Sequence, residues 1–374
     1  MAAQLLGDLI DFHNNKRVPL SSVERAEFQG EYPYYGAQSI VDHVADYRFN
    51  GEFLLVAEDG ENLRSRKAPI ASIVHGKFWV NNHAHVLTAR PGIADLKFLE
   101  ALLNWLDITA YVTGAAQPKL SMGNLRNIAV TVPDYQTQAR LGQILGDISE
   151  LAVSLQKQTS LLEKAARLIY SEWFVRQTLS HSTNWAPATL EEIVWINPKT
   201  PIETGKVAPF VPMTALSQTG MVIEGVEQRA IGGGAKFQNG DTLLARITPC
   251  LENGKTGFVQ FLDDENPVAS GSTEFIVLRS RRVNPYWVYC LARTEHFREF
   301  AIRSMSGADG RQRVSTDSLA QYPITIPPAE ILEDFEQAVG PMFEQIHTLT
   351  QQIAQLRQAR DLLLPRLISG QLRL

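Results

Sequence analysis

The sequence predicts a chain made of two copies of one unit, in which a globular part with strand-type segments is followed by a long helix. Two observations predict this architecture. A set of residues near the middle of the chain recurs near its end at a constant spacing, and each copy runs into a long amphipathic segment. The length of 374 residues is sufficient for two or three domains.

The repeat is clearest where each globular part ends. Leu125 and the stretch 130–133 recur as Leu319 and 324–327, in each case 194 residues later. The same spacing, with no gap, relates a series of helix-type residues: Gln143 to Gln337, Gly146 to Gly340, Leu162 to Leu356, Ala165 to Ala359 and Leu168 to Leu362. A pseudo-two-fold protein is suited to a pseudo-two-fold target, and duplex DNA is the commonest such target.

Composition limits the class of protein. The hydrophobic fraction of 44% is ordinary for a globular chain, and Cys250 and Cys290 give neither a disulfide framework nor a metal-binding spacing. No signal peptide and no apolar run of roughly 18 residues is present, so we expect a cytoplasmic protein. The net charge of −5 counts against a stand-alone DNA binder, although basic residues can cluster locally and partner subunits can supply more.

The first globular part carries mixed signals. Segments 52–57 and 78–80 are rich in β-branched and aromatic residues, and Asp59-Gly60 and Asn81-Asn82 favour turns. Four leucines, Leu96, Leu99, Leu102 and Leu103, predict a helix over 95–107. In the second part, segment 241–247 predicts a strand where 53–57 lies in the first, and 181–184 forms a polar linker.

Two long helices follow the globular parts. Residues 136–175 contain no proline and have apolar residues every three or four positions, and 329–368 repeats this pattern with Pro341 and Pro365, which predict a kink or a break at each. The helices can pack together as an antiparallel coiled coil, bind other subunits, or do both; alternatively each completes its own domain core. We expect antiparallel packing and the boundaries 1–135, 136–180, 181–328 and 329–374.

The chain resembles the specificity subunits of type I restriction-modification systems. The residues that carry this resemblance are the Gly-Ala-x-Gln-Pro-Lys-Leu-Ser stretch at 114–121, then Leu125 and Ile128–Pro133, Gln138 and Gln143 at the start of the helix, and the tail 363–370. The resemblance covers the whole chain in architecture and is weaker in the globular parts. The second copy departs from it, because 307–315 lacks the Gln-Pro-Lys-Leu run, so its loop is expected to hold DNA differently.

This resemblance implies an α+β fold with two target recognition domains, each reading one half of a bipartite, asymmetric sequence in double-stranded DNA. The helices would fix the gap between the half-sites and dock two methyltransferase subunits, with restriction subunits in the full complex. The cofactor S-adenosylmethionine would belong to the methyltransferase partners, and the chain itself would need none. The docking residues would be apolar positions on the helices: Leu151, Leu155, Leu162, Leu168, Ile346, Ile353, Leu356 and Leu363.

The motifs of self-contained enzymes are missing. Asn197-Pro198 and Asn284-Pro285 lack the second proline of an adenine methyltransferase, and no Gly-x-Ser-x-Gly elbow is present. Gly254-Lys255-Thr256 resembles the end of a phosphate loop, but Pro249 stands at the first glycine; Lys255 is then a DNA phosphate contact or a plain surface lysine. His83 and His85 are expected on one strand face, as a hydrogen-bonded pair, a DNA contact or, weakly, a metal site; we predict no metal site.

DNA readout requires arginine, amide and hydroxyl side chains on loops, with lysine and serine near phosphates. The loops that offer these groups predict the following DNA contacts: Tyr34, Tyr35, Gln38, Asp59, Asn62, Arg64, Lys67, Asn81, Asn82, His83, Gln117 and Lys119 in the first part, and Arg246, Thr248, Lys255, Ser270, Ser272, Thr273, Arg311, Gln312 and Arg313 in the second.

The sequence therefore predicts a non-catalytic DNA-specificity subunit. Because the two globular parts differ almost throughout, the two half-sites should differ. The alternative is a coiled-coil scaffold that binds proteins only, which the acidic net charge favours and the Arg311-Gln312-Arg313 loop opposes.

Overall fold

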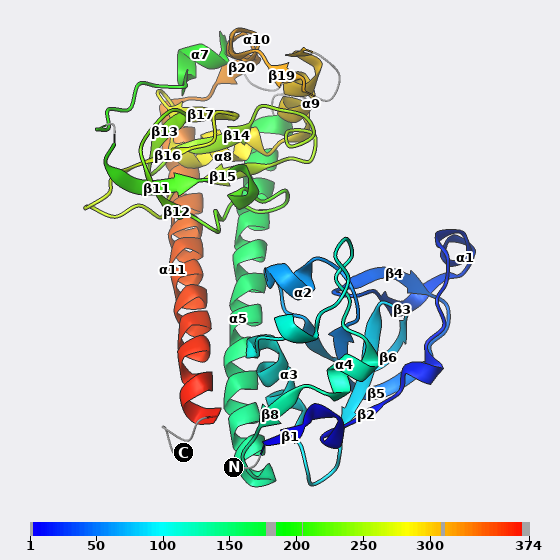
Figure 1. Ribbon diagram of the computed structural model, residues 1–374. Helices are drawn as coiled ribbons and strands as arrows, with labels where there is room; N and C mark the ends of the chain where they lie inside the picture. The colour runs from blue at the N-terminus through cyan, green and yellow to red at the C-terminus, as the bar shows by residue number, and fades with distance from the viewer. Residues whose placement is uncertain (1–2, 177–184, 204, 308–310, 369–374) are drawn as a thin grey trace. The chain divides into compact units, whose positions relative to one another are not determined.

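The computed structural model describes residues 3–176, 185–203, 205–307 and 311–368 (Figure 1). The expected linker at 181–184, part of the loop 307–315 and the end of the tail at 369–370 lie outside these residues. The chain forms two compact units, of which unit 1 comprises Met1–Val153 with Ala354–Leu374 and unit 2 comprises Ser154–Ile353. Two long helices, α5 (Tyr135–Tyr170) and α11 (Ala329–Ile368), each contribute to both units.

Unit 1 is a six-stranded sheet with short helices. The sheet has the order β2-β7-β5-β6-β3-β4, and all its pairs are antiparallel except β3 with β6. The strands are β2 (Ile10–Phe12), β3 (Gln29–Tyr35), β4 (Ile40–Val44), β5 (Phe49–Ala57), β6 (Ala71–Val80) and β7 (Ala84–Ala89), with a separate ribbon of β1 (Ala3–Leu5) and β8 (Ala129–Thr131). The helices are α1 (Ser22–Glu27), α2 (Asn62–Ser65), α3 (Leu96–Trp105) and α4 (Met122–Arg126).

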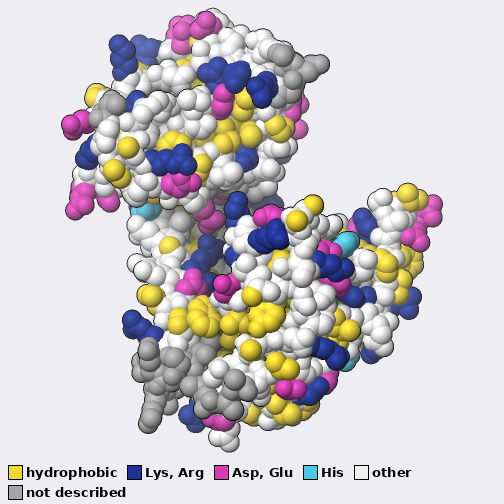
Figure 2. All heavy atoms as spheres, viewed as in Figure 1, with side chains coloured by type: hydrophobic (Ala, Val, Ile, Leu, Met, Phe, Trp, Pro, Cys, Tyr) yellow, Lys and Arg dark blue, Asp and Glu magenta, His cyan; other side chains and the backbone are white. Residues whose placement is uncertain are grey.

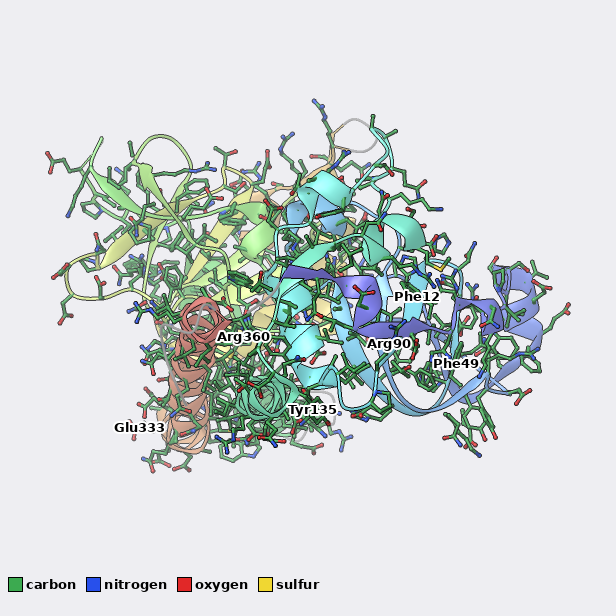
Figure 3. All side chains as sticks on the ribbon, turned by 60° about the horizontal axis from the view of Figure 1, so that its bottom comes forward. Phe12, Phe49, Arg90, Tyr135, Glu333 and Arg360 are labelled. Atoms are coloured by element: carbon green, nitrogen blue, oxygen red, sulfur yellow. The ribbon has the colours of Figure 1, made fainter. Side chains whose placement is uncertain are left out.

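Helix α3 links the sheet of unit 1 to the long helices. Its N-cap Asp95 accepts a hydrogen bond from the Phe98 amide at 2.9 Å, and its leucines and Phe98 are buried against β5. The same core contains Leu141 and Leu145 from the start of α5 and Leu364 and Leu367 from the end of α11. Each such side chain contributes roughly 1.5–3 kcal/mol when fully buried. A second, aromatic core lies within the sheet, where the rings of Phe49 (labelled in Figure 3) and Phe78 stack.

Unit 2 repeats this design with a divided sheet. One four-stranded sheet has the order β10-β17-β14-β15 and the other β12-β11-β16-β13, with ribbons β20-β9 and β18-β19. The strands are β9 (Ala186–Thr189), β10 (Val194–Ile196), β11 (Val207–Val211), β12 (Glu227–Ala230), β13 (Ala235–Gln238), β14 (Thr242–Ala245), β15 (Thr256–Phe258), β16 (Val268–Gly271), β17 (Phe275–Ser280), β18 (Met305–Ser306), β19 (Arg313–Val314) and β20 (Pro323–Ile326). The helices are α7 (Leu190–Ile193), α8 (Pro285–Ala292), α9 (Glu295–Arg303) and α10 (Thr316–Ala320).

The long helices pack in both units with opposite directions. In unit 2 the Phe335 ring, near the start of α11, lies 6.0 Å from that of Tyr170 at the end of α5 and 5.0 Å from that of Phe174 in the following π-helical turn. In unit 1 the start of α5 shares a core with the end of α11. The predicted antiparallel arrangement and the α+β class are therefore confirmed. Helix α11 runs without a break through Pro341 and Pro365, so of the predicted kink or break at each proline, the break is wrong; near Pro341, a buried face that includes Val339 and Phe343 offsets the lost hydrogen bond.

The repeat in the sequence is also a repeat of contacts. Gly146 of α5 lies against Lys97, two residues after the N-cap of α3, and a Cβ there would stand 2.9 Å from the Lys97 Cδ. Gly340 of α11 lies against Tyr286, two residues after the N-cap Asn284 of α8, at 3.3 Å. Since Gly146 and Gly340 are related by the repeat spacing, both units seat the first turn of a short helix on a glycine of a long helix.

Candidate nucleic-acid interface

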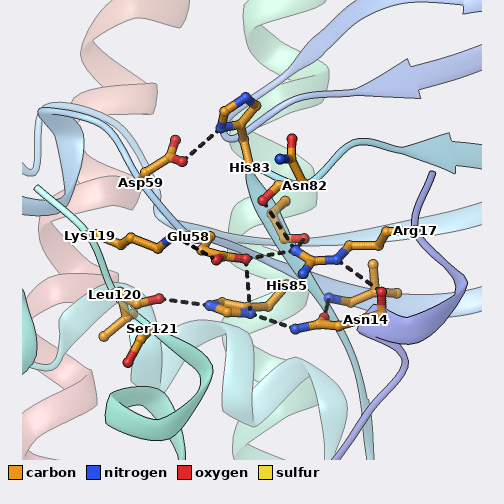
Figure 4. A network of polar contacts seen from close by, with 12 residues as sticks. Asn14, Arg17, Glu58, Asp59, Asn82, His83, His85, Lys119, Leu120 and Ser121 are labelled. Carbon is orange, nitrogen blue, oxygen red and sulfur yellow. Dashed lines mark hydrogen bonds and ion pairs between the residues drawn. The ribbon is translucent and has the colours of Figure 1, made fainter. Parts of the chain in front are cut away.

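Three loops of unit 1 that the sequence singles out meet around one carboxylate, Glu58, directly after β5 (Figure 4). Its side chain accepts a hydrogen bond from Arg17 Nη1 at 2.7 Å and lies 3.4 Å from Lys119 Nζ. Its backbone N–H donates to the His83 carbonyl, and its carbonyl accepts from the Leu120 amide. The loops at 58–67, 81–83 and 117–119 are therefore joined into one surface.

The charge of Glu58 is stabilised from several sides. Burial acts to raise the pKa of this carboxyl, but the hydrogen bond from Arg17 and the nearby His85, Arg17 and Lys119 together hold its pKa below the usual value. Beside it, Asp59 forms a 2.7 Å contact with His83 Nδ1. Lys119, which is about half-exposed, is thus an oriented cation at the rim of a rigid acidic centre.

His85 supports this centre from the core. The ring is fully buried, with Nδ1 2.9 Å from Asn14 Nδ2 and Nε2 2.8 Å from the Leu120 carbonyl. Burial lowers its pKa, so the neutral imidazole is favoured. His83 lies in the turn before β7 rather than on the strand, so the expectation that both histidines share one strand face is wrong.

Two other predicted contacts of unit 1, Arg64 and Asn81, are joined to the same loops. Arg64 holds the 113–120 loop through the carbonyls of Gly114 and Ala115 at 2.6 and 3.2 Å. The backbone N–H of Asn81 donates to the Tyr35 carbonyl, so the end of β3 lies beside the 81–83 turn. The remaining side chains are exposed: Gln38, Lys67, Asn82 and Gln117.

Three predicted DNA contacts are corrected because their side chains are buried. Tyr34 is 1% exposed in a core with Val44 and Trp79, and its hydroxyl accepts from the Leu20 amide. Asn62 bonds the Ala68 backbone in both directions, and Ser270 lies inside β16. Polar residue types predict loops, but a polar side chain whose partners are internal is not available to DNA.

Unit 2 has a corresponding cluster around Glu274. Arg313 donates to both carboxylate oxygens, with an Nη2–Oε1 distance of 2.7 Å, and Arg246 Nε lies 3.8 Å from Oε2. The hydrogen bond from Arg313 is the main cause that lowers the pKa of Glu274; burial acts to raise this pKa, and the charges of Arg313 and Arg246 lower it further. Thr248 donates its amide to the Gln312 carbonyl, and Ser272 Oγ accepts from the Glu274 amide. Arg311 and Thr273 are exposed beside this cluster.

The two clusters occupy equivalent positions with exchanged charges. The Leu120 amide donates to the Glu58 carbonyl in unit 1, and the Val314 amide donates to the Arg246 carbonyl in unit 2. Lys119 and Arg313 are related by the repeat spacing, whereas Glu58 is replaced by Arg246 and His83 by Glu274. Both units thus present a cation held by a carboxylate, but the carboxylate comes from a different strand end in each.

Lys255 has a partner of its own. The side chain is half-buried, and its ammonium donates to the Met213 carbonyl at 2.9 Å. This contact favours a structural part for Lys255 over a phosphate contact. Sequence reasoning did not single out Arg17 or Glu274, which organise the two clusters, because their partners are distant in sequence.

The predicted docking residues divide into two sets. Leu155, Ile346 and Ile353 are buried, so these three are corrected: they pack inside the chain and cannot meet a partner. Leu162, Leu356 and Leu363 are half-buried. Leu151 and Leu168 are about half-exposed, and Leu161 and Val153, which the sequence analysis did not name, are also exposed on α5.

Charge is interspersed over the visible face of both units. Figure 2 shows lysine and arginine side chains next to acidic ones, without one wide basic face. Among the described residues, no helix has the length and apolarity required to cross a bilayer.

The chain thus has two units of related design, each with a cation held by a carboxylate at the end of a sheet, and each unit includes parts of both long helices. Residues 4–163 match the family model described as "Type I restriction modification DNA specificity domain". This match covers less than half of the 374 residues, so the first part of the chain is similar to this family.

Relatives are similar to this chain over different shares of its length. A putative type I restriction enzyme specificity subunit of Haemophilus influenzae is 32% identical over 39% of this chain and 37% of its own length, so that match covers well under half of the relative. The MjaIX specificity subunit of Methanocaldococcus jannaschii is 23% identical over 92% of this chain and 87% of its own. The crystal structure of the type I restriction-modification S subunit from M. genitalium has the same fold, with a TM-score of 0.62 at 14% identity over 98% of this chain and 96% of that one.

Proposed function

We propose that this chain is the non-catalytic subunit that selects the DNA sequence for a type I restriction-modification complex. Unit 1 reads one half of a bipartite target, and unit 2 reads the other. The observation that carries this proposal is the pair of equivalent clusters with exchanged charges, Glu58–Lys119 and Arg246–Glu274–Arg313. Cations held in place by carboxylates suit base edges, because arginine and lysine bind guanine and carboxylates accept from cytosine.

Because the charges are exchanged, the two half-sites should differ. The chain would read an asymmetric sequence with a fixed gap, and the long helices would set that gap. Methylation would be carried out by two partner methyltransferase subunits, which would bring S-adenosylmethionine, with restriction subunits joining the full complex. The cellular location would be the cytoplasm, where these partners and the DNA are found together.

The test is modified-base sequencing of DNA from cells that express this chain with a partner methyltransferase. We expect one methylated motif in two unlike halves, lost without this chain. Arg313→Ala should relax the base preference in one half only, at roughly 1–3 kcal/mol of discrimination, and the double variant Gln117→Ala/Lys119→Ala should weaken the other half. An unchanged methylation pattern without this chain would favour the protein-binding scaffold, the alternative that the acidic net charge supports.

Docking of the methyltransferase is proposed on the exposed apolar side of α5. Leu161 and Leu168 are 57% and 56% exposed and lie seven residues apart, hence on one helix face. The double variant Leu161→Glu/Leu168→Glu should abolish co-purification of the methyltransferase and leave the melting temperature of the chain unchanged. Val207→Glu, at an equally exposed strand position, is the control and should retain the partner. Retention by the double variant would contradict this docking face.

A further inference from the structure

A second cationic feature lies beside the Glu274 cluster. It is an open pocket of about 660 Å³ within unit 2, between the segment that follows β10, the start of β13 and the start of β17. Lys199, Lys236 and Arg246 line it together with Thr273, and Phe275 contributes an apolar wall. Neither Lys199 nor Lys236 is among the DNA contacts predicted from the sequence.

The pocket is positive in a chain of net charge −5. Among its lining residues, all of which are described, three are cations and none is Asp or Glu. Lys199 is exposed and has no ion-pair partner in the described part of the chain, and Lys236 donates only to the Gly232 carbonyl, at 3.3 Å. Arg246 is held by one long ion pair, and its buried Nε has no hydrogen-bond partner. Cations that are not neutralised internally are available to an anion.

The walls of the pocket are fixed in place. Asn197 adopts a left-handed backbone with φ of +49°, and its Oδ1 accepts from the Val277 amide while its own amide donates to the Val277 carbonyl. These two bonds hold the segment that carries Lys199 against β17. On the other side, Gly234 has a φ of +103°, and a side chain there would collide with the Gly271 carbonyl. The positions of both lysines are thus prepared before any ligand binds.

In unit 1, an internal ion pair occupies the region that corresponds to this pocket of unit 2. By strand register, Glu58 and Ala84 are the equivalents of Arg246 and Phe275. Arg17 donates to the Glu58 carboxylate and to the Ala84 carbonyl, both at 2.7 Å, so an internal ion pair occupies the region that is open in unit 2. The pocket is therefore a property of the second recognition unit and not of the shared design.

We propose that this pocket of unit 2 binds the phosphodiester backbone of the DNA next to the half-site that unit 2 reads. The inference rests on the proposed function. Arg246 and Thr273 belong to both the pocket and the surroundings of Glu274, so a strand held in the pocket passes directly beside the base-reading cluster. The volume exceeds that of one phosphate group and accommodates a segment of sugar–phosphate chain. Backbone contacts of this kind fix position and carry no sequence information.

The experiment measures the affinity of the assembled complex for two duplexes, one with the methylated motif and one without it, over a series of salt concentrations. The variants are Lys199→Ala and Lys236→Ala, and the control is Arg282→Ala, an exposed cation beyond the far end of β17. Each pocket variant should reduce the slope of log affinity against log salt by about 0.9, because each removes one phosphate contact. The loss should be the same for both duplexes, and the methylated motif should not change.

Several results would overturn the proposal. A slope equal to that of the Arg282→Ala complex would show that the lysines do not contact phosphate. A changed motif would show that the pocket reads bases. Displacement of DNA by a free nucleoside triphosphate at micromolar concentration would identify a small-molecule site instead. Failure of the proposed function is distinguishable, because the wild-type complex would then show no preference for the motif duplex.

Discussion

Glu163 of α5 anchors the globular part of unit 2 to the long helix, and its replacement by glutamine should destabilise that unit. The carboxylate is 4% exposed and accepts from the Tyr289 hydroxyl at 2.6 Å and from the Met221 amide at 2.8 Å. Glutamine retains one acceptor oxygen, so Tyr289 or Met221 loses its acceptor to an amide N–H. A buried group left unsatisfied costs about 1–3 kcal/mol.

The measurement is urea or thermal unfolding of the full chain. For a domain of 150–250 residues, roughly 2 kcal/mol lowers the melting temperature by about 4–8 °C. Glu333→Gln, at an exposed position of α11 (Figure 3), is the matched control and should change the free energy of unfolding by less than about 0.5 kcal/mol. If Glu163→Gln has the same melting temperature as Glu333→Gln, the hydrogen bonds of Glu163 do not stabilise unit 2 as argued.

Two further predictions concern unit 1. Burial lowers the pKa of His85 below its ordinary value of 6.5, so the unfolded chain binds a proton more readily than the folded chain, and the free energy of unfolding should fall as pH drops from 7 toward 5. His85→Gln should flatten this pH dependence in unfolding measurements, and an unchanged slope would exclude His85 as its source. Gly142→Ala should destabilise the chain by about 1–3 kcal/mol, because the methyl group would overlap the Asp95 carboxylate and stand 2.8 Å from the Phe98 backbone nitrogen. Gly123→Ala in α4 has open space around the added methyl group and should be neutral or stabilising by up to about 1 kcal/mol. Equal melting temperatures for these two variants would contradict the close packing at Gly142.

The sequence carried the long-range architecture well. Periodicity every three or four residues and the 194-residue spacing predicted both long helices, and the leucines of α3 predicted a helix over 95–107 where the structure has Leu96–Trp105. These signals are local or repeated, so one chain is enough to read them. The prolines of α11 do not break the helix as they could have, because tertiary packing outweighs the loss of one backbone hydrogen bond.

The candidate site was predicted only in part. Loop composition brought out Lys119, Arg246 and Arg313, but it could not show that Tyr34 and Ser270 point into cores. The organising partners, Arg17 and Glu274, act across 41 and 39 residues respectively, and no periodic pattern marks such pairs. One signal was available in the sequence. The repeat spacing relates Lys119 to Arg313, so these two cations could have been predicted to occupy equivalent positions in the two units.

Under the proposed function, the glycine seats on the long helices would bear on the spacing between the two DNA half-sites. In unit 1, Gly142 and Gly146 are one helical turn apart on α5, and Gln138 precedes them by another turn, with its amide bonded to the Ile93 and Pro133 carbonyls. A slip of α5 by one turn, about 5.4 Å, would bring the bulk of Gln138 to the place of Gly142. That step exceeds the 3.4 Å rise of a DNA base pair along one strand. Under the proposed function, the seat would oppose a one-turn slip of α5, which could otherwise change the spacing of the target by a whole base pair.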